Sequence, residues 1–572
     1  MIPFGKPLSA RRIASMAENA RRIQEVESEV FLTKEKVRSA GISAEEMHKR
    51  GQLTASERIE KTVDPGTFLP LNSIYDPLAN EEGTTGLLQG MGRVAGRYAS
   101  VIASDHKVLA GAWIPGHAEK IFRAQDLAEK LRIPLIWILN CSGIKLSEQE
   151  KLFAGRRSGG RTFFRHAELL QRGIPVVVGV FGTNPAGGGY HAISPAFIFA
   201  HSDSNMAVGG GGIVSGMSPQ GGFDLEGAEM VIGATRRFRE IPPGRAQTHF
   251  EHTGFFREVY DTEEGVLEAI RRCVSGLPFY SPDLLRVAEP AEPRLPGSEI
   301  KHIVPFNQKA TYEMEQVLSR LVDQSEHLPF RADYGPEIYC GLARFSGFPA
   351  GVIANRQGFL GKNYPPYAQG AYNGVGGKLY REGLIKMIEF VTLCGRDRIP
   401  LLWFQDTTGI DVGDLAEKAE LLGLGQSLIY SIESSGVQMM CVVLRKGSAA
   451  AHYVMGGPQA NRNNALTLGT PTTEIYVMHG ETAAVAAYAR RLVKEKDAGR
   501  PLDPIIARMN ALSRQYYEQS RPLYCAQMGL VDEIVPYSAL REYLCAFIGA
   551  AYQNPPSLCP PHQMLLPRLI RG

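Results

Sequence analysis

The stretch IPLIWILNCSGI, residues 133–144, recurs as IPLLWFQDTTGI at residues 399–410. Six of the twelve positions are identical, including the tryptophan, and the second copy follows the first at an offset of 266. Each copy reads as a buried strand that ends in small residues. Downstream, VGVFGTNPAGGGYHA resembles CVVLRKGSAAAHYVM, with Gly188 against Ala450 at an offset of 262. Two nearly equal offsets predict two duplicated domains of the same fold.

Strand and helix patterns alternate from Gly90 to about Ser275. We expect a helix over 117–131, a strand over 133–139, and two strands within 94–105 joined by a turn at 96–98. This alternation predicts the α/β class.

The N-terminal segment is rich in Arg, Glu, Lys and Ala with helical spacing, and it contains two capping boxes, Ser43–Glu46 and Thr54–Glu57. Prolines crowd the middle of the chain, which is typical of a linker. The sequence therefore predicts a helical arm (1–60), an N-terminal domain (61–285), a Pro-rich linker (286–305) and a C-terminal domain (306–572).

Composition excludes several classes of protein. The 62 basic and 59 acidic residues give a net charge of only +3, too balanced to predict nucleic-acid binding. The eight cysteines include no CxxC pair, which favours buried free thiols and a reducing, cytoplasmic location. The sequence holds no signal peptide, no run of about 18 apolar residues, no P-loop, no GxGxxG fingerprint and no clustered set of metal ligands. His191 and His452 are interpreted as packing or capping residues.

The chemistry is expected at the four strand ends of the repeat: Cys141–Ile144, Pro185–Gly189, Thr407–Ile410 and Gly447–Ala451. A strand followed by Gly or Ala at the opening of a helix exposes backbone N–H groups. Two such turns side by side can aim two donors at one oxygen and stabilise an enolate formed from a thioester. The alternative is that these small residues only permit tight packing of helix on strand. A branched side chain at Gly188 is expected to block the substrate without disturbing the fold.

Three longer motifs carry a family resemblance: KRGQLTASERIEKTVDPGTF (49–68), GTNPAGGGYHAISP (182–195) and RKGSAAAHYVMGGPQ (445–459). They resemble the carboxyltransferase subunits of biotin-dependent acyl-CoA enzymes. Around Asp406–Gly413 the chain follows the pattern of the glutaconyl-CoA decarboxylases rather than that of the carboxylases.

The resemblance implies a pair of crotonase-like ββα-spiral domains, the first binding acyl-CoA and the second binding biotin. It also implies a homo-oligomer of at least two chains, in which the first domain of one chain faces the second of another. The cofactor would be biotin on a carrier subunit, and the substrate a coenzyme A thioester, here glutaconyl-CoA. A membrane sodium-pump subunit would be a further partner, holding this cytoplasmic chain peripherally at the membrane.

The family's site residues can be placed on this chain where the motifs match. The thioester oxygen would be held by backbone amides near Ile144, Gly187 and Gly188, and the biotin ureido oxygen by those near Ile410, Ala449 and Ala450. The set expected to line the ligand sites is Ala110, Gly111, Gly143, Gly189, Gly409 and Ala451.

Two other functions stay open. The chain can be the carboxyltransferase subunit of an ATP-dependent acyl-CoA carboxylase of the methylcrotonyl- or propionyl-CoA type. It can also be a non-catalytic scaffold subunit with the same fold.

Overall fold

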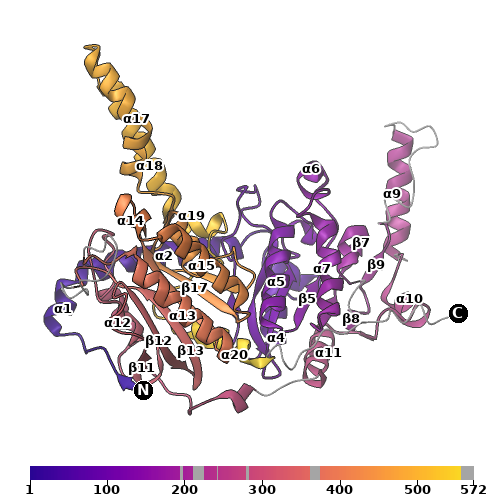
Figure 1. The fold of residues 1–572 in the computed structure, drawn as a ribbon. Helices are drawn as coiled ribbons and strands as arrows, with labels where there is room; N and C mark the ends of the chain where they lie inside the picture. Colours follow the sequence, from indigo (N-terminus) through magenta and orange to yellow (C-terminus); the bar gives the residue numbers. More distant parts are fainter. Residues whose placement is uncertain (193–196, 210–224, 241–242, 278–281, 361–373, 555–572) are drawn as a thin grey trace. The chain divides into compact units, whose positions relative to one another are not determined.

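The computed structural model describes residues 1–192, 197–209, 225–240, 243–277, 282–360 and 374–554. The chain forms two compact units (Figure 1). The N-terminal unit comprises Lys34–Ser281 with Gln553 and Asn554, and the C-terminal unit comprises Met1–Thr33 and Pro282–Tyr552. The expected arm (1–60) and linker (286–305) stay predictions, and residues 555–572 of the expected C-terminal domain lie outside the described residues.

The N-terminal unit is built on a seven-stranded sheet of order β10-β8-β6-β5-β4-β3-β2. Its strands are β2 (Leu69–Pro70), β3 (Leu87–Val94), β4 (Arg97–Ser104), β5 (Leu135–Leu139), β6 (Val176–Val180), β8 (Phe197–His201) and β10 (Glu258–Tyr260). The two pairings among β2, β3 and β4 are antiparallel, and all others are parallel. A small parallel sheet joins β7 (Thr183–Pro185) to β9 (Asn205–Ala207).

Helices cover both faces of this sheet. Side chains of α5 and α7 form one core with alternate strand residues, and those of α4 and α11 form the other. The helices are α3 (Ala44–Lys49), α4 (Ala55–Thr62), α5 (His117–Leu131), α6 (Gln149–Leu152), α7 (Gly159–Gln171), α9 (Leu225–Glu240), α10 (Ala246–Glu251) and α11 (Glu263–Gly276), with the 3₁₀ helix η3 (Ala186–Ala192).

The C-terminal unit repeats this plan with a nine-stranded sheet of order β1-β11-β12-β13-β15-β17-β18-β20, where β19 also pairs with β17. Its strands are β1 (Ile2–Pro3), β11 (Glu326–Pro329), β12 (Ile338–Phe345), β13 (Phe348–Asn355), β15 (Leu401–Thr407), β17 (Met439–Ser448), β18 (Asn464–Gly469), β19 (Glu474–Tyr476) and β20 (Glu533–Ile534). A separate two-stranded sheet pairs β14 (Lys378–Leu379) with β16 (Gly409–Ile410).

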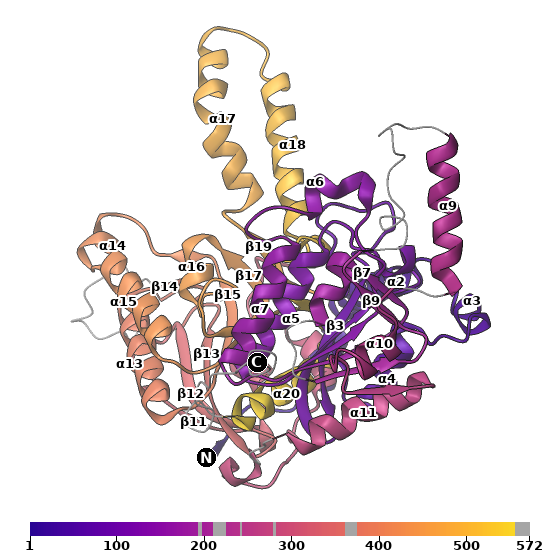
Figure 2. The same cartoon turned by 90° about the vertical axis from the view of Figure 1, so that its right-hand side faces the viewer.

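Its helices are α1 (Ala10–Ser15), α12 (Met314–Leu318), α13 (Arg381–Asp397), α14 (Asp414–Lys418), α15 (Leu421–Ser434), α16 (Ala449–Val454), α17 (Gly480–Asp497), α18 (Asp503–Ser520), α19 (Pro522–Gln527) and α20 (Leu540–Gln553). Helices α17 and α18 form a hairpin that stands out from the rest of this unit (Figure 2). Helix α2 (Ala17–Arg38) spans the boundary between the units.

The predicted duplication and α/β class are confirmed. An antiparallel strand pair is followed by a helix and then by a parallel strand in both units, as β3-β4-α5-β5 in one and as β12-β13-α13-β15 in the other, where the short β14 precedes α13. Trp137 lies beside Ile102 of the neighbouring strand, and Trp403 lies beside Ile353 in the same register. Both tryptophans are fully buried in the core of their unit.

The expected helix 117–131 and both capping boxes are confirmed, and β5 begins two residues later than expected. The expectation of two strands within 94–105 is wrong. Val94 ends β3, and β4 runs from Arg97 to Ser104. The turn is Ala95–Gly96, where both residues have positive φ, as the tightest hairpins require.

An aspartate carboxylate holds the turn of the β3–β4 hairpin, and another holds the turn of the β12–β13 hairpin. Asp64 accepts hydrogen bonds from the N–H groups of Ala95 and Gly96, at 3.1 and 2.7 Å, and pairs with Arg271 at 3.0 Å. In the C-terminal unit, the side chain of Asp323 accepts from the N–H groups of Ser346 and Gly347, at 3.1 and 2.7 Å, and pairs with Arg541 at 2.7 Å. Each carboxylate thereby fixes the register of its first strand pair.

We predict that Asp323→Ala lowers the free energy of unfolding of the C-terminal unit by about 3 kcal/mol, because it leaves the N–H groups of Ser346 and Gly347 without their acceptor and removes one partner of the largely buried Arg541. Calorimetric unfolding measures the loss. Asp283→Ala removes an exposed carboxylate that pairs with Arg286 at 3.2 Å, so it should change stability by less than about 1 kcal/mol. Equal effects of the two substitutions would contradict the role given to Asp323.

Candidate active site

The first candidate turn, Cys141–Ile144, follows the carboxyl end of β5. It is held to Trp113 by two backbone hydrogen bonds, from the Trp113 N–H to the Gly143 carbonyl at 2.8 Å and from the Lys145 N–H to the Trp113 carbonyl at 2.9 Å. Successive residues of an extended segment turn their N–H groups to opposite edges. The N–H of Ile144 therefore faces away from Trp113, and within the described part of the chain it donates no hydrogen bond.

The C-terminal unit repeats this arrangement. Ile410 of β16 lies opposite Leu379 of β14, and the Asp411 N–H donates to the Leu379 carbonyl at 3.1 Å. The interval from Trp113 to Leu379 is the same as the interval from Ile144 to Ile410. The structure thus gives the two predicted isoleucines equivalent backbone positions.

The glycine before each isoleucine is required by the backbone. Gly143 has φ 116° and Gly409 has φ 139°, a region that side chains rarely allow. A Cβ built on either glycine would meet no heavy atom within 4 Å. Both turns therefore present open backbone on which a ligand could rest.

The second candidate segment of each unit begins at an alanine in a left-handed conformation. Ala186 opens η3 with φ 48°, and Ala449 opens α16 with φ 50°. Such values are uncommon for a residue other than glycine and cluster at functional sites. Before each alanine, the chain pairs with a short parallel strand, β9 or β19.

This geometry corrects the alignment of the two halves. Ala186 matches Ala449 at an offset of 263, so Gly188 matches Ala451 rather than Ala450. Burial agrees, since Gly188 and Ala451 are buried whereas Gly187 and Ala450 are not. The matched pair that faces outward is therefore Gly187 and Ala450.

The three consecutive glycines at 187–189 differ in what a side chain would meet at each position. A Cβ on Gly188 would lie 2.5 Å from the Cys141 carbonyl oxygen, and one on Gly189 would lie 2.6 Å from Met206 Cγ, whereas one on Gly187 would meet nothing within 4 Å. Gly188 and Gly189 thus allow η3 to pack closely on the first turn and on β9. The expectation that a branched residue at Gly188 leaves the fold intact is wrong, because the carbonyl of Cys141 occupies that space.

The loop that contains Ala110 and Gly111 touches the first turn. Leu109, Ala110 and Gly111 all have positive φ, of 46°, 53° and 73°. The Ser142 N–H donates to the Ala110 carbonyl at 3.3 Å, and a Cβ on Gly111 would lie only 1.9 Å from the carbonyl oxygen of the residue before Cys141. Ala110 itself is exposed. The structure places this loop against the turn that contains Gly143 and Ile144.

A pocket of about 360 Å³ adjoins the start of η3 in the N-terminal unit. Ala186, Gly189, Tyr190, Met206 and Phe255 are among its lining residues. The lining is predominantly apolar, which suits an aliphatic chain.

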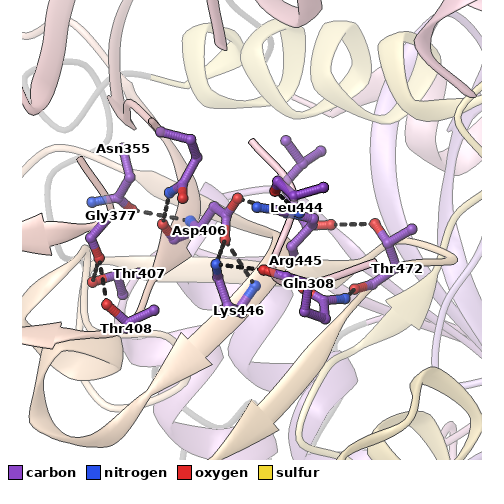
Figure 3. A network of polar contacts seen from close by, with 12 residues as sticks. Gln308, Asn355, Gly377, Asp406, Thr407, Thr408, Leu444, Arg445, Lys446 and Thr472 are labelled. Atoms are coloured by element: carbon purple, nitrogen blue, oxygen red, sulfur yellow. Dashed lines mark hydrogen bonds and ion pairs between the residues drawn. The ribbon is translucent and has the colours of Figure 1, made fainter. Parts of the chain in front are cut away.

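The second turn has anchors that the sequence analysis missed. The carbonyl of Gly377 accepts from the Thr408 N–H at 2.7 Å and from the hydroxyls of Thr407 and Thr408 at 3.2 and 3.1 Å (Figure 3). The Gly409 N–H donates to the Thr407 hydroxyl at 3.3 Å. Gly377 is the counterpart of Gly111 at the interval of the repeat, so that interval was a signal that could have found it.

Charged residues that the sequence analysis also missed are buried behind this turn (Figure 3). Asp406 and Arg445 are both fully buried, and the Arg445 Nε lies 2.7 Å from an Asp406 carboxylate oxygen. Lys446 approaches the other carboxylate oxygen at 3.5 Å. The Asp406 N–H donates to the Asn355 side chain at 3.0 Å. The pattern that could have revealed them is Arg-Lys directly after the apolar run of β17.

Burial shifts the pKa values of several groups here. It raises the pKa of Glu474 to about 7, although the nearby Lys446 and Arg445 oppose the shift. It lowers the pKa of Lys446, opposed by Asp406.

The two candidate histidines are packing residues, as expected. Burial lowers the pKa of His452 to about 4, and its ring hydrogen-bonds the Gln405 side chain at 2.8 Å. His191 is fully buried between Trp113 and Trp137, with ring centroids at 5.0 and 4.9 Å. Both rings are therefore neutral at pH 7.

No group of three or more metal-ligating side chains comes together in the described ranges. Of the helices in those ranges, none combines the length and the apolar character needed to cross a membrane.

We predict that Gly188→Ala destabilises the N-terminal unit by about 1–3 kcal/mol, since the added methyl overlaps the Cys141 carbonyl. Gly187→Ala, the matched control, should change stability by less than about 0.5 kcal/mol because it points into open space. Calorimetric unfolding compares the two. If Gly188→Ala were as stable as Gly187→Ala, the packing role of Gly188 would be wrong.

Comparisons with known proteins identify the family of this chain. The Carboxyl transferase domain family matches residues 46–565. Glutaconyl-CoA decarboxylase subunit alpha of Acidaminococcus fermentans is 53% identical over 572 residues, 100% of this chain and 97% of that protein. The biotin-dependent 3-methylcrotonyl-coenzyme A carboxylase beta1 subunit of Mycobacterium tuberculosis is 30% identical over 485 residues, 83% of this chain and 84% of that one.

Among solved structures, the beta subunit of P. aeruginosa geranyl-CoA carboxylase matches with a TM-score of 0.76 and 22% identity, covering 99% of both chains. This likeness concerns the fold, and it confirms the expected pair of crotonase-like domains. The family match spans most of the chain and includes most of both duplicated α/β units. The strand register beside the two turns is the same in both units. The chain therefore belongs to the carboxyl transferase domain family.

Proposed function

We propose that this chain is the carboxyltransferase subunit of a glutaconyl-CoA decarboxylase. It moves the terminal carboxyl group of glutaconyl-CoA to biotin on a partner subunit and leaves crotonyl-CoA. The observation that carries the proposal is the duplicated pair of open backbone turns, one pair in each unit. The 53% identity to a glutaconyl-CoA decarboxylase alpha subunit over the whole chain supports the choice of substrate.

In the N-terminal unit, the amides of Ile144 and Gly187 are proposed to hold the thioester oxygen. When the bond to the terminal carboxyl group breaks, its electron pair stays on the acyl chain as a dienolate whose charge lies largely on that oxygen. A fixed amide donor stabilises such a charge without reorganisation and lowers the barrier by about 2.7–4 kcal/mol. The apolar pocket beside Ala186 is suited to the hydrocarbon part of the substrate.

In the C-terminal unit, the amides of Ile410 and Ala450 are proposed to hold the ureido oxygen of biotin. The fit rests on the open backbone at Gly409 and on the outward-facing small residue at position 450. Biotin, when bound, supplies a ring nitrogen that takes the carboxyl group and gives up the proton that the acyl carbon receives. Here the chain's own part is to keep donors fixed and side chains out of the way.

The remaining proposals concern assembly. The chain acts as a homo-oligomer in which the N-terminal unit of one copy works with the C-terminal unit of another. Its other partners are a biotin carrier subunit and a membrane sodium-pump subunit, which holds it peripherally at the cytoplasmic side of the membrane. Neither nucleic acid nor ATP is a ligand.

The purified chain is predicted to transfer label from glutaconyl-CoA, ¹⁴C-labelled in its terminal carboxyl group, to free biotin without ATP, because the carboxyl group is already on the acyl chain. Acid-labile label on biotin and stoichiometric crotonyl-CoA measure the reaction. 3-Methylglutaconyl-CoA, the product of a methylcrotonyl-type carboxylase, serves as the comparison substrate. Label on biotin only from that comparison substrate would favour the ATP-dependent carboxylase. No transfer from either thioester would favour the scaffold function.

A further inference from the structure

Each site has two segments of open backbone, and in the N-terminal unit a side chain ties them together. That side chain is Asn184, which is fully buried. Its oxygen accepts a hydrogen bond from the Cys141 N–H at 2.7 Å, and its amide nitrogen donates to the Phe181 carbonyl at 2.8 Å. Asn184 comes three residues before Gly187, and Cys141 comes three residues before Ile144. One hydrogen bond thus joins the two segments that carry the proposed donors.

The matching positions of the C-terminal unit are joined by backbone instead. The counterpart of Cys141, at an offset of 266, is Thr407. The counterpart of Asn184, at an offset of 263, is Gly447. Thr407 and Gly447 lie opposite each other in the parallel pairing of β15 with β17, whereas the pairing of β5 with β6 ends at Leu139, two residues before Cys141. Beyond the end of that pairing, the Asn184 side chain supplies the acceptor.

The C-terminal unit has a bridging side chain of its own, which comes from the other segment. Gln405 on β15 is fully buried. Its amide nitrogen donates to the His452 carbonyl at 2.8 Å, and its oxygen hydrogen-bonds the His452 ring at 2.8 Å. His452 lies on α16, two residues after Ala450. A Cβ on Gly447 would lie 2.6 Å from a ring nitrogen of His452, so the glycine makes room for the ring that Gln405 holds.

The two units therefore differ in which segment carries the bridge. The counterpart of Gln405 at the offset of 266 is Leu139, which is buried and apolar. Neither Leu139 nor Gly447 has a side chain that can hydrogen-bond. A buried amide side chain is costly unless its polar atoms are paired. Each unit nevertheless buries one at this place, which indicates that a link between the two segments is required in both.

The separation of the two segments decides whether both donors act. The two proposed N–H groups of each site come from different segments, so one oxygen must lie within hydrogen-bond distance of both. A misplacement of about 1 Å can cost about 100-fold in rate. Because all the proposed donors belong to the backbone, their spacing depends on the contacts that hold the segments together.

We propose that Asn184 and Gln405 are positioning residues, each of which holds the two segments of its own unit at the spacing at which both amides reach one oxygen. For Asn184 that oxygen belongs to the thioester, and for Gln405 it belongs to the ureido group of biotin. The inference rests on the proposed function and goes beyond it, because it names the side chains that set the geometry of each site.

The test compares Asn184→Ala and Gln405→Met with a matched control, Asn205→Ala. Asn205 is a buried asparagine of β9, in the same small sheet as Asn184, and its side chain donates to the Thr183 hydroxyl at 3.1 Å. Its removal leaves the acceptor of the Cys141 N–H in place. Calorimetric unfolding checks that each variant is folded.

Three quantities are measured on each variant. The first is kcat for carboxyl transfer from glutaconyl-CoA to biotin methyl ester. The others are the ¹³C resonances of two bound probes, crotonyl-CoA labelled at the thioester carbonyl and biotin methyl ester labelled at the ureido carbonyl. In the unchanged protein each resonance should lie downfield of that of the free probe, since hydrogen bonds to the oxygen withdraw electron density from the carbonyl carbon.

Asn184→Ala should lower kcat about 10- to 100-fold, as expected for a misplaced oxyanion donor. It should return only the thioester resonance toward its free position. Gln405→Met should lower kcat by a similar factor and return only the ureido resonance. Asn205→Ala should leave kcat within about twofold and both resonances in place, because surrounding contacts of the turn are intact.

A purely structural role predicts lower stability with both resonances unmoved, and that result overturns the inference. An effect of Asn205→Ala equal to that of Asn184→Ala overturns it as well. If Asn184→Ala does not fold, Gln405→Met decides, since it leaves the N-terminal unit unchanged, and an unmoved ureido resonance there contradicts the proposal. If the unchanged protein transfers no carboxyl group, the proposed function fails. If it transfers normally and both bridging variants match it, only this inference fails.

Discussion

The site depends on one constraint: a backbone amide must be kept out of strand pairing while the residues around it are held by strand pairing. At Ile144 and Ile410 a short parallel pairing fixes the neighbouring residues, through Trp113 in one unit and Leu379 in the other. The isoleucine N–H points to the opposite edge, because successive residues of an extended strand point their N–H groups to opposite edges. A donor held in this way needs no side chain of its own, and its direction is set by the sheet.

Each of the two units supports this arrangement with its own sheet and core. The strands that carry the turns are central in their sheets, and Trp137 and Trp403 fill the core beneath them. The close packing of Gly188 on Cys141 brings the second segment to the first in the N-terminal unit. In the C-terminal unit, Gln405 connects β15 to α16, since its side-chain amide donates to the His452 carbonyl at 2.8 Å. One fold thus repeats the same pair of open backbone turns in both units.

Sequence reasoning reached the parts of the site that repeat in both backbone and residue type. Gly143–Ile144 and Gly409–Ile410 could be predicted because identical residues recur at a constant interval. The sequence comparison matched Gly188 to Ala450, which is one residue away from the correct partner, Ala451. A run of glycines aligns equally well with a run of alanines when it is shifted by one residue. The left-handed φ of Ala186 and Ala449 fixes the correct register, and the burial of Gly188 and Ala451 agrees with it. Arg445 and Lys446 follow an apolar run that signals them, but their contact with Asp406 could not be predicted, since Asp406 lies on a different strand and meets them only through the pairing of β15 with β17.

Isotope-edited infrared spectroscopy of bound ligands tests the central claim, that each unit polarises one carbonyl group. The probes are crotonyl-CoA with a ¹³C thioester carbonyl and biotin methyl ester with a ¹³C ureido carbonyl. Each band should move to lower frequency on binding, because a carbonyl that accepts two fixed hydrogen bonds is weakened. Gly187→Val should abolish only the thioester shift, and Ala450→Val only the ureido shift. Shifts that persist in both variants, or that respond to the opposite variant, would contradict the account.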